Sequence, residues 1–261
     1  MRLALAWILI TATVAAAAQT ASFEVASIKL NTSGLASSRT SSRDNGFVAT
    51  NTTVKFLIIS AFNLKDFQLS GGPTWVASDR YDVNARVREG AKYTREMLRT
   101  LLEERFKLVT HRESRDDAIY SLVVAHADGR LGPRLKPTAT LDCTPGRGAN
   151  PGGPLTSPCS FNSSIGDVTG KMSAVGQGLE ALAALLGNFG LGRLVVDRTG
   201  LTGRYDFELQ WSYDALRPNA DAAGEPGLFT ALQEQLGLKL ETARGPVEFV
   251  VIDSIERPRP D

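Results

Sequence analysis

Few residues of the sequence have the types and spacing that acid–base or nucleophilic chemistry needs. The two histidines are His111, in a segment that alternates like a strand, and His126, at the start of a segment rich in Gly and Pro. Neither has a Ser, Cys or His partner at a recognisable spacing, and no Gly-x-Ser-x-Gly elbow occurs. The sequence therefore predicts no catalytic residue. The alternative is a hydrolase in which the fold carries a histidine to a carboxylate inside a pocket.

Acidic residues and glycines could bind ions or phosphates, but their positions argue against both. Asp197 and Asp206 flank one turn and could hold calcium with loop carbonyls, yet the alternating acidic ligands of a calcium loop are missing. The glycines of 187–192 follow a helical segment, whereas dinucleotide-binding glycines follow a strand and open a helix. We therefore expect no metal and no cofactor.

The first eighteen residues have the pattern of an export signal, with Arg2, an apolar stretch from Leu3 to Val14, and small residues up to Ala18. Cleavage near Ala18 would leave a periplasmic or secreted protein. A membrane anchor is the alternative, but the apolar stretch is shorter than the roughly 20 residues that a spanning helix needs. After cleavage, the chain is expected to keep no membrane span.

Charge and cysteine content narrow the class of partner. Loss of Arg2 from the 29 basic residues would leave them equal in number to the 28 acidic ones, so the basic excess of a nucleic-acid binder is missing. Cys143 and Cys159 enclose a Gly- and Pro-rich stretch, and in an exported chain they predict one disulfide that closes a loop. Such a bridge contributes about 3 kcal/mol. A metal site would need a second pair of ligands.

The elements that would position these residues occur twice. Arg-Tyr-Asp opens a strand at 80–82 and again at 204–206, and the segments around the two copies follow one order. The apolar positions of the first helix of each copy have identical spacing: Val54, Leu57, Ile58 and Ala61, then Leu179, Leu182, Ala183 and Leu186. The sequence predicts an α+β fold of two similar β-α-β-β-α-β-β units in tandem.

Further segments complete the predicted domain organisation. An N-terminal strand in "ASFEVASIKL" should pair with an edge of one sheet, and 212–226 should form a loop. The predicted parts are a signal peptide at 1–18, the N-terminal strand and a Ser-rich loop at 19–44, the first unit at 45–125, a Gly/Pro-rich linker with the disulfide at 126–168, the second unit at 169–255 and a tail at 256–261.

Four aromatic residues form the candidate binding surface. Trp75 lies in a predicted Gly-Pro turn and Trp211 ends a predicted strand, and at both positions the ring could meet a partner or a hydrophobic ligand. Tyr81 and Tyr205 belong to the two Arg-Tyr-Asp strands. The alternative for all four is packing in the core, with hydrogen-bonded hydroxyls for the tyrosines. In that interpretation the neighbouring aspartates fix the adjacent backbone.

Segments such as "SGGPTWVASDRYDV", "ERFKLVTHRE" and "VVDRTGLTGRYDFELQW" resemble a family of soil-bacterial exported proteins of unknown function. Some members are fused to membrane metallopeptidases of the beta-lactam-sensor type, which implies a sensing domain outside the cytoplasm. This chain has no His-Glu-x-x-His motif of its own. Each half is also similar to the short N-terminal domain of secretins and TonB-dependent receptors, a protein-contact module.

Together these patterns predict an exported, non-catalytic interaction or sensing module. Its expected partner is a protein of the envelope or periplasm, which it would contact through strand edges or helix faces. The alternative is a small-molecule-binding protein with a cleft between the two units.

Overall fold

The structure is a computed structural model of mixed α+β class. It describes residues 21–35, 37–43, 45–138, 159, 161–166, 169–189, 191–212 and 226–259. The predicted signal peptide, Cys143 and nearly all of the loop at 212–226 lie outside these ranges, so the predicted disulfide with Cys159 stays a prediction. In the described part, twelve strands form three four-stranded sheets, and the chain divides into two compact units.

The first unit comprises described residues within 1–64, 71–111 and 252–261 and contains sheet A. This sheet is antiparallel and has the order β1-β5-β3-β2. Its strands are β1 (Val25–Leu30), β2 (Arg39–Arg43), β3 (Gly46–Thr53) and β5 (Arg80–Arg86). The predicted N-terminal strand is β1, and its pairing with β5 at the sheet edge confirms the expectation.

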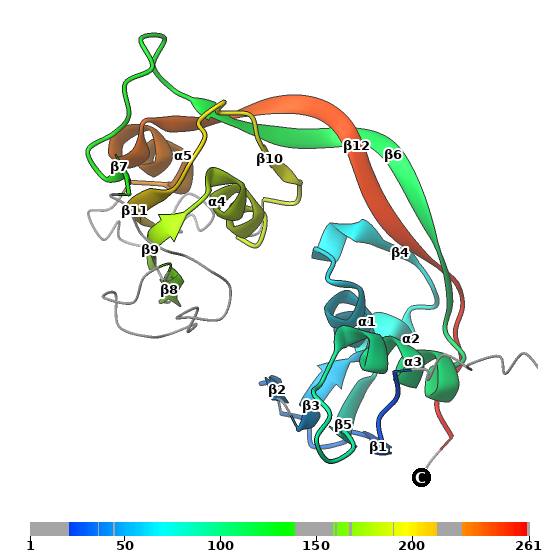
Figure 1. Cartoon of the computed structure of the whole chain (residues 1–261). Coiled ribbons are helices and arrows are strands. Elements are labelled where there is room, and N and C mark those ends of the chain that lie inside the picture. Colours follow the sequence, from blue (N-terminus) through cyan, green and yellow to red (C-terminus); the bar gives the residue numbers. More distant parts are fainter. Residues whose placement is uncertain are drawn as a thin grey trace, which may run out of the picture. The chain divides into compact units, whose positions relative to one another are not determined.

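Two helices of the first unit, α1 (Val54–Phe62) and α3 (Arg95–Phe106), contact each other, and α1 follows directly from β3 (Figure 1). Thr53 caps α1 by accepting a hydrogen bond from the Phe56 N–H, and Asn63 ends it in the left-handed conformation. The predicted apolar face of α1 is confirmed as buried. A further turn of helix, α2 (Trp75–Ser78), stands where the sequence predicted only a turn.

The second unit comprises described residues within 65–70 and 112–251 and contains sheet C, with the order β7-β11-β9-β8. Its strands are β7 (Leu135–Pro137), β8 (Phe161–Ile165), β9 (Thr169–Gln177) and β11 (Tyr205–Ser212). Its helices are α4 (Leu179–Leu186), α5 (Leu228–Ala231) and the π-helical turn η3 (Leu232–Leu236) that continues α5. The predicted apolar face of α4 is confirmed as buried.

Sheet B has the order β10-β6-β12-β4 and corrects one prediction. It contains two long strands, β6 (Val109–Val124) and β12 (Leu238–Ser254), and two short ones, β4 (Leu69–Gly71) after the 3-10 turn η1 (Asp66–Gln68), and β10 (Val195–Asp197). The two closing strands predicted for each unit are one continuous strand (Figure 1). The midsection of β6 is exposed, and Arg244 of β12 donates to the Asp116 carboxylate at 2.8 Å and to the Asp116 carbonyl at 2.6 Å, so the two neighbouring strands are joined there without burial.

The first Arg-Tyr-Asp holds a bulge in the neighbouring strand. The register of β3 against β5 shifts between Ala49 and Thr52, and Asn51 at the shift has a left-handed φ of 55°. The Asp82 carboxylate accepts from the Asn51 N–H at 2.8 Å, and the Arg80 guanidinium donates to the Asn51 carbonyl at 2.9 Å. Both backbone groups of the bulge residue are thereby satisfied by one motif.

The second Arg-Tyr-Asp makes the same contacts in sheet C. Gly176, with a φ of 64°, donates its N–H to Asp206 at 2.9 Å and accepts from Arg204 at 2.7 Å. The prediction that both aspartates fix the adjacent backbone is confirmed. In each sheet, the strand that carries the motif forms hydrogen bonds to the bulge residue of the neighbouring strand.

Three strands lie in segments that were predicted from the sequence to be loops. They are β2 in the Ser-rich segment, and β7 and β8 in the segment at 126–168. All three stand at sheet edges, where one side of the strand pairs and the other does not. A short polar edge strand buries too little apolar surface to leave an alternating pattern in the sequence.

Candidate functional site

His111 lies beside a carboxylate, as the hydrolase alternative requires, but the pair is exposed to solvent. Its Nδ1 is 2.8 Å from Oδ1 of Asp253, and the two side chains are 52% and 41% exposed. A catalytic pair works where water is excluded and a substrate can be held, and this one stands open to solvent. His126 is exposed as well. Among the described residues, no three His, Cys, Asp or Glu side chains are placed to hold a metal ion.

The four aromatic residues of the predicted binding surface are buried. Their exposed fractions are 9% for Trp75, 3% for Tyr81, 1% for Trp211 and 7% for Tyr205. The Tyr205 hydroxyl donates to the Thr202 carbonyl at 3.3 Å. Burial favours packing as their role; a binding role for them stays a prediction.

Trp75 and Tyr81 are brought together by an arginine near the C-terminus. The Arg257 guanidinium lies 5.0 Å from the centre of the Trp75 ring, and its Nε donates to Asp79 at 3.0 Å. Burial and the nearby Asp79 charge raise the pKa of Tyr81, while Arg257 opposes that rise. Every charge of this cluster has a partner inside the cluster, so it is a structural tie between the C-terminal segment and β5.

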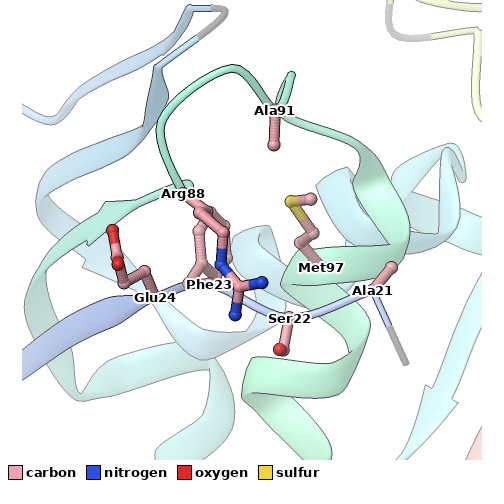
Figure 2. A pocket seen from close by; sticks show the side chains of 7 residues that line it. All are labelled: Ala21, Ser22, Phe23, Glu24, Arg88, Ala91 and Met97. Atoms are coloured by element: carbon pink, nitrogen blue, oxygen red, sulfur yellow. The ribbon is translucent and has the colours of Figure 1, made fainter. Parts of the chain in front are cut away.

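A first pocket of about 490 Å³ is lined by the N-terminal segment, the turn after β5 and helix α3 (Figure 2). Its charged groups, Glu24 and Arg88, extend in different directions, and Met97 supplies an apolar wall. Ala21 and the residues after it follow directly on 1–20, which the structure does not describe. The pocket gives no convergent set of polar groups that would select a ligand.

A second pocket, here named the β2–α1 pocket, has a volume of about 660 Å³. It runs between the edge strand of sheet A and the first helix. Thr40 and Ser42 of β2 line it together with Phe47, Phe56, Ile59 and Tyr93. The lining is completed by Ser60, Asn63, Leu64, Thr94 and Arg95, so the pocket has a polar side as well as an apolar one. Phe56, on the apolar side, is 44% exposed although it is large and hydrophobic. Tyr93 stacks with Phe47 and Phe23, which fixes one wall, and its burial raises its pKa.

Strand β2 presents an open edge beside this pocket. It pairs with β3 on one side, all five of its residues are exposed, and the described part of the chain places no strand on its other side. In an antiparallel pair, alternate residues direct their N–H and C=O groups away from the partner strand. These outward groups are free to pair with another extended chain.

A buried residue of β3 forms hydrogen bonds to the segment that leads into β2. The side-chain amide of Asn51, at the bulge of β3, donates to the carbonyls of Leu35 and Ser37, just before β2 begins. Asn51 is 2% exposed and is itself held by Asp82 and Arg80. The first Arg-Tyr-Asp therefore positions the edge strand through one buried residue.

This site was not predicted from the sequence, because the Ser-rich segment has the composition of a loop. One signal was present in the sequence: the large apolar Phe56 falls outside the predicted apolar face of Val54, Leu57, Ile58 and Ala61.

Comparison with known proteins gives one family. A model of the family described as "Protein of unknown function (DUF3738)" matches residues 55–255. No curated protein and no solved structure gave a significant match. No helix within the described ranges has the length and apolar character to cross a membrane.

Proposed function

We propose that this chain, which belongs to the family of unknown function DUF3738, is a non-catalytic interaction module that binds an extended segment of a partner protein along β2. The observation that carries this proposal is the open edge of β2 next to the β2–α1 pocket, in which the apolar Phe56 side chain is exposed. A segment that adds to the edge gains backbone hydrogen bonds, and every second side chain of it enters the pocket.

The surrounding features support this kind of binding over catalysis. The edge strand is short and polar, so it does not favour aggregation, while Phe56 and Ile59 offer apolar surface in the adjoining pocket. The His111–Asp253 pair is open to solvent. The other edge of sheet A is less open, because Arg105 donates to the Ala26 carbonyl of β1 at 3.3 Å.

The partner that we propose is a protein of the envelope or periplasm, and the support for this location is the signal-like sequence at 1–18. We also propose that the chain consists of two similar units in tandem. The shared strand pattern of sheets A and C and the two equal Arg-Tyr-Asp contacts support this. The predicted loop closed by Cys143 and Cys159 belongs to the same proposal.

Site-specific photocrosslinking tests the proposal in cells that export the protein. A photoreactive amino acid replaces Ser42, which faces the β2–α1 pocket, and in a second variant Ser163, at the matching face of β8. We expect cross-links from position 42 to one extended segment of one protein, and none to that segment from position 163. Equal cross-linking from both positions, or cross-links from 42 only to this chain, would overturn the proposal.

A further inference from the structure

We infer that the segment bound along β2 is acidic at alternate positions and apolar at the positions between them. This inference rests on the proposed function and adds the chemistry of the partner. It follows from the different side chains that the two faces of β2 present to an added strand.

The solvent face of β2 is basic. The register pairs Arg39 with Thr50, Ser41 with Val48 and Arg43 with Gly46. Because paired residues share a face, both arginines lie on the side of the exposed Val48 and Thr50, away from the helices. They are four residues apart on one strand, so a strand added at the edge would bring two of its own same-face side chains next to them.

These two arginines have no carboxylate partner within the described part of the chain. Further cations stand on the same face of sheet A, namely Lys29 of β1 and Arg80 and Arg86 of β5. The acidic side chain of this face, Asp82, is already bonded to Asn31 and to the Asn51 N–H, each at 2.8 Å. The described residues of this face therefore carry an excess of positive charge, and Arg39 and Arg43 place part of it at the edge where a strand would pair with β2.

The other face of β2 lies beside the β2–α1 pocket, which has an apolar and a polar side. Thr40 and Ser42 lie on this face. The apolar side of the pocket is formed by Phe47, Phe56 and Ile59, and the polar side includes Asn63, Thr94 and Arg95. Side chains of an added strand that point the same way would reach the pocket. Valine- or isoleucine-sized residues suit that position, because they are favoured in strands and bury apolar surface.

The equivalent edge in the second unit has a different character. On β8 the register places Asn162 and Ser164 opposite Ser173 and Lys171 of β9. The Lys171 ammonium is already paired with Glu208 at 2.7 Å, which also lowers the pKa of Glu208. The sheet face beside β8 is thus neutral where the face beside β2 is basic. We expect the preference for acidic strands to belong to sheet A alone.

The combination of a backbone edge and alternating side-chain contacts favours a polypeptide over other anions. A nucleic acid or an anionic lipid surface could approach Arg39 and Arg43, but neither has peptide groups for the edge of β2. The spacing of the two arginines along one strand matches same-face residues of a peptide.

Fluorescence anisotropy with three labelled decapeptides tests the inference. Glutamate alternates with valine in the first, lysine with valine in the second, and glutamate with serine in the third. We expect the first to bind at least tenfold more tightly than either of the others. One cross-strand pair of opposite charges changes a dissociation constant by about 1.5- to 5-fold, so Arg39→Glu with Arg43→Glu should weaken binding of the first peptide by about tenfold or more.

Two controls make each outcome decisive. Asn162→Glu with Ser164→Glu places the same charges on β8 and should leave the affinity unchanged, and Phe56→Ala should weaken only the two valine peptides. If the glutamate–valine and lysine–valine peptides bind the native protein with equal affinity, and both bind Phe56→Ala more weakly, the acidic preference is overturned. Strand addition along β2 would still stand. Failure of every peptide to bind would count against strand addition itself. Tighter binding of a 20-nucleotide single strand or of anionic vesicles, lost in the arginine double variant, would overturn the choice of a polypeptide.

Discussion

Replacing Trp211 by alanine should lower the free energy of unfolding by about 3–5 kcal/mol. The side chain is 1% exposed, and its ring meets Phe189 edge to face at a centroid distance of 4.9 Å. The ring also fills the space beside Gly170, where an added Cβ would stand only 2.3 Å from it. Close packing on this scale cannot collapse around the missing ring, so the variant carries a cavity. Urea denaturation followed by circular dichroism measures the loss.

Phe56→Ala is the matched control for the tryptophan variant, because it also truncates an aromatic ring but one that is 44% exposed. We expect it to change the free energy of unfolding by less than about 1 kcal/mol. If Trp211→Ala unfolds as the native chain does and instead loses binding of the partner, the aromatic residue acts at the surface and the packing role is wrong.

Asp82→Ala should cost about 2–3 kcal/mol of stability, because the variant leaves the Asn51 N–H and the Asn31 side chain without their acceptor. It should also weaken binding at β2, although Asp82 lies outside the β2–α1 pocket. The reason is that Asn51 holds the carbonyls of Leu35 and Ser37 that lead into the edge strand. Thermal unfolding and peptide titration below the melting temperature measure the two effects separately.

Two controls accompany the aspartate variant. Asn84→Ala changes an exposed residue of the same strand and should stay within about 0.5 kcal/mol of the native chain. Asp206→Ala removes the equivalent acceptor of Gly176 and Thr138 in sheet C, so it should cost as much stability but leave binding at β2 unchanged. Loss of binding in both aspartate variants would mean that unfolding, and not the position of β2, explains the effect.

Helices and central strands could be predicted from the sequence, because burial of one face leaves a regular spacing of apolar residues. The identical spacing in α1 and α4 marked both buried faces correctly, and the alternation around Tyr81 and Tyr205 marked the strands that carry them. The repeated Arg-Tyr-Asp pointed to one local structure used twice. Its task of holding a bulge could not be seen in the sequence, because the bulge residue is Asn51 in one sheet and Gly176 in the other.

The candidate site could not be predicted, because its edge strand is not buried and therefore shows no period of apolar residues. An edge strand such as β2 satisfies half of its backbone groups and buries none of its side chains, so it leaves little apolar pattern. Trp75 and Trp211 were predicted as binding residues because they are large and aromatic, but both are buried. The exposed aromatic side chain that borders the pocket is Phe56. Exposure depends on which face a helix turns to the sheet, and this is a tertiary property.

Hydrogen exchange of the β2 backbone amides, measured by NMR with and without a bound peptide, tests the central claim most directly. In the free protein, the amides at alternate residues of Arg39–Arg43 that point away from β3 should exchange rapidly, and those bonded to β3 slowly. With the glutamate–valine decapeptide bound, the outward amides should become protected, while those of β8 remain as they were. Protection that is unchanged at β2 when the peptide is bound, or that appears equally at β8, would contradict binding by strand addition.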